Sequence, residues 1–580
     1  MEKTTHSNKK DKILWHSKSR IQIAQIERFI IKYSGELPVW LKVKNVSKFK
    51  FRAGYLGGPF NVYCDVVTKK YKQSEKVEDT SDIPQFKSII QPQDKFIIQL
   101  SQGGTSDSFL WIVNVMSEML FNTDSHVSFE VSLGTCKSIL KNKYLHHTNI
   151  ENSEPNLSVE ILNTQDIWGL HKSTNNTDTH LVVLTHGLHS NVTADMSYLM
   201  EQIYQHCSKD DNIVVEGFNG NVCQTEKGVK YLGYRLAEHI VTNLYTDSIT
   251  KISFIGHSLG GLIQTFAMEY IFTKYPWFFE KVQPINFITL AAPLLGLHTV
   301  NNPAYVKYAL SKGLVGKTGK DLSLHKDTLN DNQSLLYLMS GAPLPKILLK
   351  FQRRTLYANA INDGIVPLYT SSLLFLDYDD ILEKLKSRKE RLPSASIINS
   401  VTSILVPASP KETFLSDPEL REDSIIHDRV YSEDHIDAIV ERYSDTVLKS
   451  FYSSSKPNLQ EVIARRWHHN GISWRKVIVA TSGDAHNNIM VRRKFTNAYG
   501  WPVIDHLIQN HFKDNDESIL PSISLSDKQL GEVDFVEPNK LFSWITRIED
   551  PKIYKEGMLT VASGIFQRTM TPKKLESKEV

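Results

Sequence analysis

The apolar positions of this chain follow one pattern in its first quarter and another in the rest. Residues 28–135 contain short alternating or apolar runs, such as FIIKYS and HVSFEVSLG, separated by Gly, Pro, Asn and charged turns. This pattern is typical of antiparallel β-strands. We therefore expect a β-domain of sandwich type over 28–150, preceded by a flexible N-terminus over 1–27 and followed by a linker over His146–Pro155.

Beyond the linker, nearly continuous apolar runs alternate with segments that carry apolar residues at helical spacing. Strands that are apolar on both faces are typical of a parallel sheet covered by helices on each side. We therefore expect a doubly wound α/β domain with a mostly parallel sheet over 156–515. The expected strands are His180–Thr185, Asn212–Glu216, Lys251–Ile255, Ile285–Leu290, Arg354–Ala360 and Arg475–Ala480, and the expected helices are Asp195–Cys207, Gly228–Tyr245, Gly261–Tyr275 and Pro502–Phe512.

Two insertions interrupt this alternation, over 293–352 and 367–474. The first contains an apolar stretch, Ser334–Phe351, that suits a cap over a fatty acyl chain or, equally, a helical hairpin buried on the core. The second mixes Pro, Ser and opposing charges over Leu392–His427, which predicts a partly flexible segment. The remainder, 516–580, forms a C-terminal extension.

Composition excludes several classes of protein. The 580 residues include 67 Lys and Arg against 64 Asp and Glu, a balance too even for a protein built to bind nucleic acid. The four cysteines form no C-x-x-C pair, so neither a disulfide framework nor a zinc module is expected. The N-terminal region lacks an apolar signal core, and every apolar run is shorter than the roughly 18 residues that span a bilayer. We expect a cytoplasmic protein that is not secreted, has no transmembrane segment and is at most peripheral on a membrane.

One motif predicts chemistry. Gly256-His257-Ser258-Leu259-Gly260 is a G-x-S-x-G sequence directly between a predicted strand and a predicted helix. In that context the glycines permit a sharp turn that exposes the serine hydroxyl at the edge of the sheet, so Ser258 is the candidate nucleophile. A glycine-rich turn that only allows close packing is the alternative.

A serine nucleophile needs a base and an acid that orients the base. Asp363 lies in an Asn-Asp-Gly turn after the fifth predicted strand, and His486 lies in the polar loop after the sixth. The order Ser258, Asp363, His486 is that of α/β-hydrolases, which makes Asp363 the candidate acid and His486 the candidate base. Asp363 also suits a purely structural turn, and Asp484 is expected to have a turn role.

The oxyanion of such a reaction needs backbone N–H donors. We expect them at Leu259, which begins the helix after the serine, and at Leu188, in the His-Gly-Leu turn that ends the first predicted strand. A simple strand-ending turn is the alternative for Leu188. The scattered histidines lack metal-ligand spacing and no nucleotide-binding loop is present, so neither metal nor cofactor is expected.

Ordered motifs over most of the chain resemble the serine-esterase/lipase family of fungi, which are α/β-hydrolase proteins typified by yeast lipases. The resemblance rests on LPVWLKVKN, LVVLTHGLHSN, FIGHSLGGL, LAAPLLG, LYANAINDGIVP and GDAHNNIMVRR. It implies an intracellular enzyme of lipid degradation that acts on monoacylglycerol or phospholipid esters and associates with lipid droplets. By position it also implies Ser258 as nucleophile, Asp363 as acid and His486 as base.

Other functions remain open at this point. The same triad would serve an acyltransferase or a thioesterase, because a triad alone does not fix the acceptor or the leaving group. A catalytically idle hydrolase fold could also act as a lipid-binding or regulatory protein, with the β-domain as its docking module. The intact set of candidate catalytic residues favours hydrolysis of a lipid ester.

Overall fold

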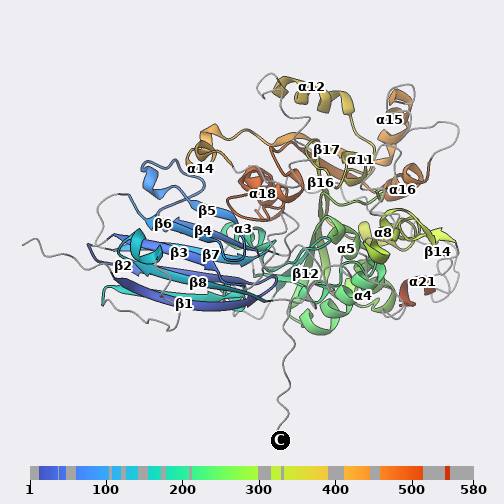
Figure 1. Ribbon diagram of the computed structural model, residues 1–580. Helices are drawn as coiled ribbons and strands as arrows, with labels where there is room; N and C mark the ends of the chain where they lie inside the picture. The colour runs from blue at the N-terminus through green and yellow to red at the C-terminus, as the bar shows by residue number, and fades with distance from the viewer. Residues whose placement is uncertain are drawn as a thin grey trace, which may run out of the picture. The chain divides into compact units, whose positions relative to one another are not determined.

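The chain forms two compact units, which we describe separately (Figure 1). Unit 1 comprises Met1–Leu170 together with Pro410–Glu422, and unit 2 comprises His171–Ser409 together with Asp423–Val580. The computed structural model describes residues 12–36, 38–47, 61–103, 108–118, 126–141, 155–170, 178–207, 212–297, 315–327, 332–389, 410–443, 458–513 and 542–548.

Unit 1 contains two antiparallel sheets with a common core. Phe29 lies in one sheet and makes edge-to-face contacts with Trp15 and Phe129 of the other, at ring-centroid distances of 6.0 and 6.4 Å. All three side chains belong to one buried hydrophobic cluster. The first sheet has the order β1 (Ile13–Gln22), β8 (His126–Gly134), β3 (Val39–Asn45), β6 (Lys95–Leu100); the second has the order β5 (Gln85–Ile90), β4 (Val62–Thr68), β7 (Phe109–Ser117), β2 (Ile26–Tyr33), β9 (Leu157–Asn163).

Two expectations about the ends of this unit are wrong. A flexible N-terminus was expected over 1–27, but β1 pairs along its length with β8, and only 1–11 lie outside the described residues. The α/β domain was expected to begin at 156, but β9 pairs with β2 and therefore belongs to unit 1. Both strands fall outside the expected bounds because their partners, β8 and β2, are remote in the chain. Most of the expected linker, 146–154, lies outside the described residues.

Unit 2 is built on a seven-stranded mixed sheet, and the six strand positions expected from the apolar runs are all found in it. Five neighbouring pairs run parallel, and the seventh strand, β17, pairs antiparallel with β18 at the edge. The order is β11 (Ile213–Gly217), β10 (Thr179–Thr185), β12 (Ile249–His257), β13 (Gln283–Leu290), β16 (Arg353–Asn359), β18 (Trp474–Val479), β17 (Ile425–Tyr431).

The four expected helices are present and form two pairs. α4 (Val229–His239) contacts α5 (Leu259–Lys274), and both contribute to a large core cluster with alternate residues of β10 and β12. α3 (Ser197–His206) contacts α18 (Trp501–His511). Because successive side chains of a strand point to opposite faces, this arrangement accounts for strands that are buried on both sides.

The first insertion packs into the core of unit 2. α9 (Leu335–Met339) and α10 (Leu344–Leu348) both contact α5, and their apolar residues belong to the same core cluster. Of the two interpretations of this stretch, the buried hairpin is therefore favoured over the acyl-chain cap. The insertion also contains α8 (Gly316–Leu322) and the short strands β14 (Lys326–Asp327) and β15 (Gln333–Ser334), whereas 298–314 lie outside the described residues.

The second insertion is more regular than expected. Residues 392–409 of the segment expected to be flexible lie outside the described residues, but 410–422 join unit 1 and β17 extends the sheet of unit 2. The helices in its described residues are α11 (Leu368–Ser371), α12 (Tyr378–Lys389), α14 (Glu412–Ser416), α15 (Ile436–Tyr443) and α16 (Leu459–His468). Within the described parts of the chain, no helix has the length and apolar character needed to cross a membrane.

The described part of the C-terminal extension, residues 542–548, contains the short helix α21 (Ser543–Thr546). Its Ile545 is fully buried in the core of unit 2, and its Trp544 contacts Phe266 of α5 edge to face at 6.1 Å. This short helix therefore contributes to the same core that supports the helix after Ser258.

Candidate active site

Ser258 occupies a strained turn between β12 and α5. Its backbone angles are φ 54° and ψ −126°, a conformation that few residues other than glycine adopt. The residue before it ends the strand, and the residue after it begins the helix. This is the geometry of a nucleophile elbow, which projects a hydroxyl above the carboxyl ends of the parallel strands.

Close backbone contacts explain why glycines surround the serine. A Cβ at Gly260 would overlap the carbonyl oxygen of Thr185, at the end of β10. A Cβ at Gly187, in the turn after β10, would lie 2.8 Å from the Cβ of Ser258 and 3.3 Å from its hydroxyl oxygen. The absence of both side chains lets the turn after β10 approach the serine directly.

His486 and Asp363 are brought together from segments separated by 123 residues. His486 lies in α17 (Ala485–Asn488), after β18, and Asp363 lies in the turn after β16. Nδ1 of His486 is 3.0 Å from Oδ2 of Asp363, and the two side chains are only 8% and 3% exposed. These adjacent strands run parallel, so both residues lie at the same edge of the sheet as Ser258.

The carboxylate of Asp363 is held by further hydrogen bonds. Its Oδ1 accepts from the backbone N–H groups of Ile365 and Val366, at 3.0 and 2.8 Å. Its Oδ2 accepts from Nδ2 of Asn359 at 2.8 Å, in addition to its contact with His486. Burial alone would raise the pKa of Asp363, but the charge of His486 and these hydrogen bonds outweigh burial and lower it. The group is therefore a fixed anion at neutral pH.

His257 connects the serine turn to the segment that carries His486. Its Nε2 lies 2.8 Å from the backbone carbonyl oxygen of His486, and the two imidazole rings have a centroid distance of 4.8 Å. A carbonyl can only accept, so Nε2 of His257 carries the proton. This bond places His486 next to the residue that precedes Ser258.

The pKa values distinguish His486 from the two other histidines beside the serine turn. Burial lowers the pKa of His186, and it lowers the pKa of His257 to about 3, so both rings are neutral. Burial also disfavours the charged form of His486, but the charge of Asp363 outweighs it and raises the pKa of His486 above its usual value. Among these three, His486 is the one suited to accept and release a proton near neutral pH.

The two candidate oxyanion donors lie beside the serine. Leu259 is the first residue of α5, where backbone N–H groups have no partner within the helix. Leu188 follows Gly187, and the next residue, His189, has φ 51° and donates its N–H to Oγ1 of Thr225 at 3.1 Å. In the described part of the chain no hydrogen bond joins the hydroxyl of Ser258 to the ring of His486.

The competing residues have other partners. Asp484 accepts from the backbone and side chain of Asn487 and caps α17, as its expected turn role requires. His506 contacts Tyr357 and Asp428, whereas His468 is buried with Nδ1 against the carbonyl of Ala464. Over the described ranges, no group of three or more His, Cys, Asp or Glu side chains is arranged to hold a metal ion.

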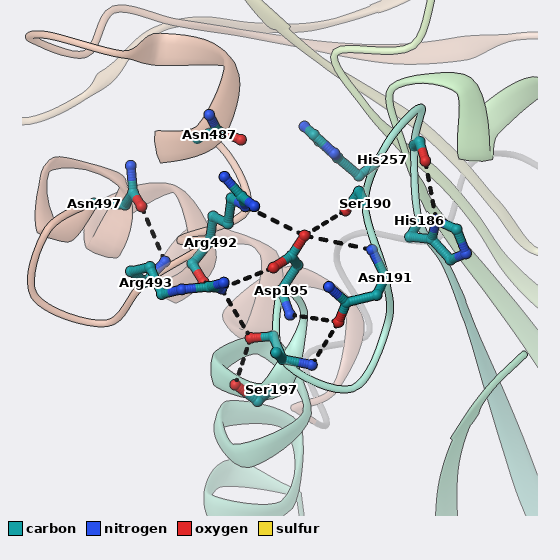
Figure 2. A network of polar contacts seen from close by, with 12 residues as sticks. His186, Ser190, Asn191, Asp195, Ser197, His257, Asn487, Arg492, Arg493 and Asn497 are labelled. Atoms are coloured by element: carbon teal, nitrogen blue, oxygen red, sulfur yellow. Dashed lines mark hydrogen bonds and ion pairs between the residues drawn. The ribbon is translucent and has the colours of Figure 1, made fainter. Parts of the chain in front are cut away.

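The sequence interpretation missed a buried ionic network beside this site (Figure 2). Asp195, between the turn after β10 and α3, contacts Arg492 and Arg493, which follow α17. The side chain of Asp195 is fully buried. The sequence did contain a signal for this network: a charged residue at the start of a predicted helix, and the Arg-Arg pair in GDAHNNIMVRR. The sequence alone could not show that these residues pair, because the pairing depends on the tertiary fold.

A serine in a strand–turn–helix elbow on a largely parallel sheet is the arrangement of α/β serine hydrolases. Residues 175–373 match the family model described as "Putative serine esterase (DUF676)", a range that includes Ser258 and Asp363. The chain is 44% identical to "Putative lipase ROG1" of Saccharomyces cerevisiae, over 96% of this chain and 93% of that protein. It is 43% identical to "Putative lipase YDL109C" of the same yeast, over 96% and 97%. The chain therefore belongs to the serine-esterase/lipase family that these fungal proteins represent.

Among solved structures, a match is found to "the putative cell surface hydrolase from Lactobacillus plantarum WCFS1". It is 14% identical, covers 40% of this chain and 98% of its own, and has a TM-score of 0.21. The family assignment rests on the two yeast relatives.

Proposed function

We propose that the protein hydrolyses carboxylic esters of lipids, with monoacylglycerols or phospholipids as substrates, through Ser258, His486 and Asp363. The observation that carries this proposal is the buried Asp363–His486 pair, joined through the His486 carbonyl to His257, the neighbour of Ser258. The names of the yeast relatives support a lipid ester as the substrate. We also propose the α/β-hydrolase fold for unit 2 and a β-sandwich for unit 1.

The reaction begins with the transfer of a proton. His486 accepts the hydroxyl proton of Ser258 while the serine oxygen attacks the ester carbonyl carbon. The negative charge that develops on the carbonyl oxygen is stabilised by the N–H groups of Leu188 and Leu259. Each such donor typically lowers the barrier by about 3 to 4 kcal/mol.

The acyl-enzyme then forms and breaks down. Protonated His486 donates its proton to the leaving alcohol, and the carbonyl carbon stays bonded to the oxygen of Ser258. Water, activated by His486, attacks this ester and releases the fatty acid. Asp363 stabilises the imidazolium in both steps and keeps Nε2 of His486 directed at the reacting atoms.

The test measures free fatty acid released from monoacylglycerol, triacylglycerol and phospholipid by the purified full chain. Ser258→Ala and His486→Ala should each lower kcat by about 10⁴-fold or more, because each removes a group that acts as part of one unit. His506→Ala is the matched control, because His506 is a histidine of the same unit outside the site, and it should retain activity.

The products distinguish this function from its alternatives. Free fatty acid that depends on Ser258 supports hydrolysis. A new ester in the presence of an added alcohol, without free fatty acid, would indicate acyl transfer, and release from a thioester alone would indicate a thioesterase. No release from any of these substrates by the wild-type chain would contradict the proposal.

A further inference from the structure

One buried carboxylate of unit 2 has no part in the chemistry proposed above. Asp195 belongs to a segment that we name the oxyanion loop (residues 186–197), and its side chain contacts a second segment that we name the base segment (residues 485–493). We propose that Asp195 is a positioning residue: it fixes the oxyanion loop and the base segment relative to each other, so that Leu188 and His486 act on the same carbonyl. The inference rests on the proposed function.

Asp195 holds the base segment through two arginines. Its Oδ1 lies 2.8 Å from Nη1 of Arg493, and its Oδ2 lies 3.2 Å from Nε of Arg492. Nη1 of Arg493 also donates to the backbone carbonyl of Ala194 at 3.3 Å, so this guanidinium contacts both the side chain and the backbone of the oxyanion loop. The contacts cross between segments almost 300 residues apart.

The same carboxylate organises the oxyanion loop. Oδ2 of Asp195 accepts from the hydroxyl of Ser190 at 2.6 Å and from the backbone N–H of Asn191 at 3.4 Å. Both donors lie within three residues of Leu188 in the chain. Figure 2 shows Asp195 with Ser190 and Asn191 on one side and Arg492 and Arg493 on the other.

The base segment transmits this contact to His486. The backbone N–H of Arg492 donates to the carbonyl of Asn487 at 3.0 Å, and that of Arg493 donates to Oδ1 of Asn497 at 2.9 Å. Nδ2 of Asn497 in turn donates to Oδ1 of Asn488 at 2.8 Å. The arginines are therefore joined by short hydrogen bonds to the helical turn that contains His486.

Opposite charges stabilise the contact between Asp195 and the two arginines. Burial would raise the pKa of Asp195, but the two guanidinium groups and the Ser190 hydroxyl lower it well below its usual range. The carboxylate is therefore charged at every working pH. Removal of one charge from such a buried group leaves its partners uncompensated, and the two segments lose the contact that fixes their separation.

The consequence for catalysis is geometric. The oxyanion donors and the general base must both be positioned around one tetrahedral carbon. A displacement of either group by about 1 Å lowers the rate by about 10²-fold. Asp195 contacts neither candidate donor nor the base, so its effect passes through the two segments. Its loss should therefore lower kcat rather than weaken substrate binding.

The experiment compares Asp195→Asn, Arg493→Gln and their double variant with Asp428→Asn in the full chain. Asp428 also pairs with an arginine, Arg475, but on the edge strand β17, away from the site. Hydrogen exchange by mass spectrometry follows peptides of the oxyanion loop and the base segment, and kcat and KM are measured with a water-soluble butyrate ester. Circular dichroism verifies that each variant is folded.

We expect exchange in both segments to rise together by about tenfold in Asp195→Asn and Arg493→Gln, and not in Asp428→Asn. We expect kcat of each single variant to fall by about 10²-fold, with KM within about twofold of the wild-type value. The kcat of the double variant should be no lower than that of the more impaired single variant. Faster exchange in only one segment, an unchanged kcat, or a rise in KM that accounts for the whole loss would overturn the inference.

Failure of the proposed function would be recognised separately. If the wild-type chain hydrolyses no ester, the hydrolase proposal fails at that step. The exchange measurement still decides whether Asp195 couples the two segments, because it requires no turnover. If neither segment changes in Asp195→Asn, the coupling itself is refuted.

Discussion

At the scale of single residues, Asp363 determines how His486 behaves. Four hydrogen bonds to its carboxylate fix both its position and its charge. Because an anion next to an imidazole stabilises the protonated ring, Asp363 raises the pKa of His486, whereas the neighbouring His257 stays neutral. A single carboxylate thus separates the candidate base from the other buried histidines.

Substitution of Asp363 by Asn should change both the rate and its pH dependence. The hydrogen-bonding shape is largely kept, but the ring loses the charge that raises its pKa, and kcat should fall by about 10³- to 10⁴-fold. Activity requires neutral His486, so the acidic limb of the kcat/KM–pH profile should move to lower pH. Asp428→Asn should leave that limb in place, and a limb that does not move in Asp363→Asn would contradict this role.

At the scale of secondary-structure elements, α14 shows how a distant segment completes a unit. It lies in the second insertion of the α/β part of the sequence but belongs to unit 1. The hydroxyl of Tyr71 donates to the carbonyl of Leu415 at 2.9 Å, and the backbone N–H of Val77 donates to that of Ser416 at 2.8 Å. Leu415 itself is 3% exposed.

Leu415→Ala should therefore destabilise unit 1. Removal of a buried leucine side chain typically costs about 2 to 5 kcal/mol, and we expect the lower part of this range because α14 is a helix of only five residues with two buried side chains. Leu420→Ala is the matched control, since Leu420 is 60% exposed in the same segment, and it should be nearly neutral. Urea unfolding followed by circular dichroism measures both, and equal effects would show that α14 does not pack as described.

Much of unit 2 could be predicted from the sequence because its signals are local. Six apolar strands and four helical segments have apolar patterns that lie within single elements, and the elbow at Ser258 has its own glycine pattern. The edge strand β17 was missed because its exposed residues include charged Asp428 and Arg429, which interrupt the apolar run expected of a buried strand. α14 and β9 were misassigned because their partners are remote in the chain, and spacing carries no such information.

At the scale of the whole molecule, the candidate site is assembled from segments that are far apart in the sequence. The turns after β10, β12, β16 and β18 lie at one edge of the sheet of unit 2, because these strands run parallel. The order of the candidate catalytic residues along the chain predicted this convergence. The network around Asp195 could not be predicted in this way, because an ion pair between Asp195 and Arg493 exists only once the fold has formed.

The most direct test of the account is the mapping by mass spectrometry of a fluorophosphonate adduct on the intact wild-type chain. We predict one adduct, on Ser258, whose rate of formation falls sharply in His486→Ala and is lost in Ser258→Ala. These variants should remain folded by circular dichroism. An unlabelled Ser258 in a folded and otherwise intact wild-type chain, or an adduct on another serine that persists in both variants, would contradict the assignment of Ser258 as the nucleophile.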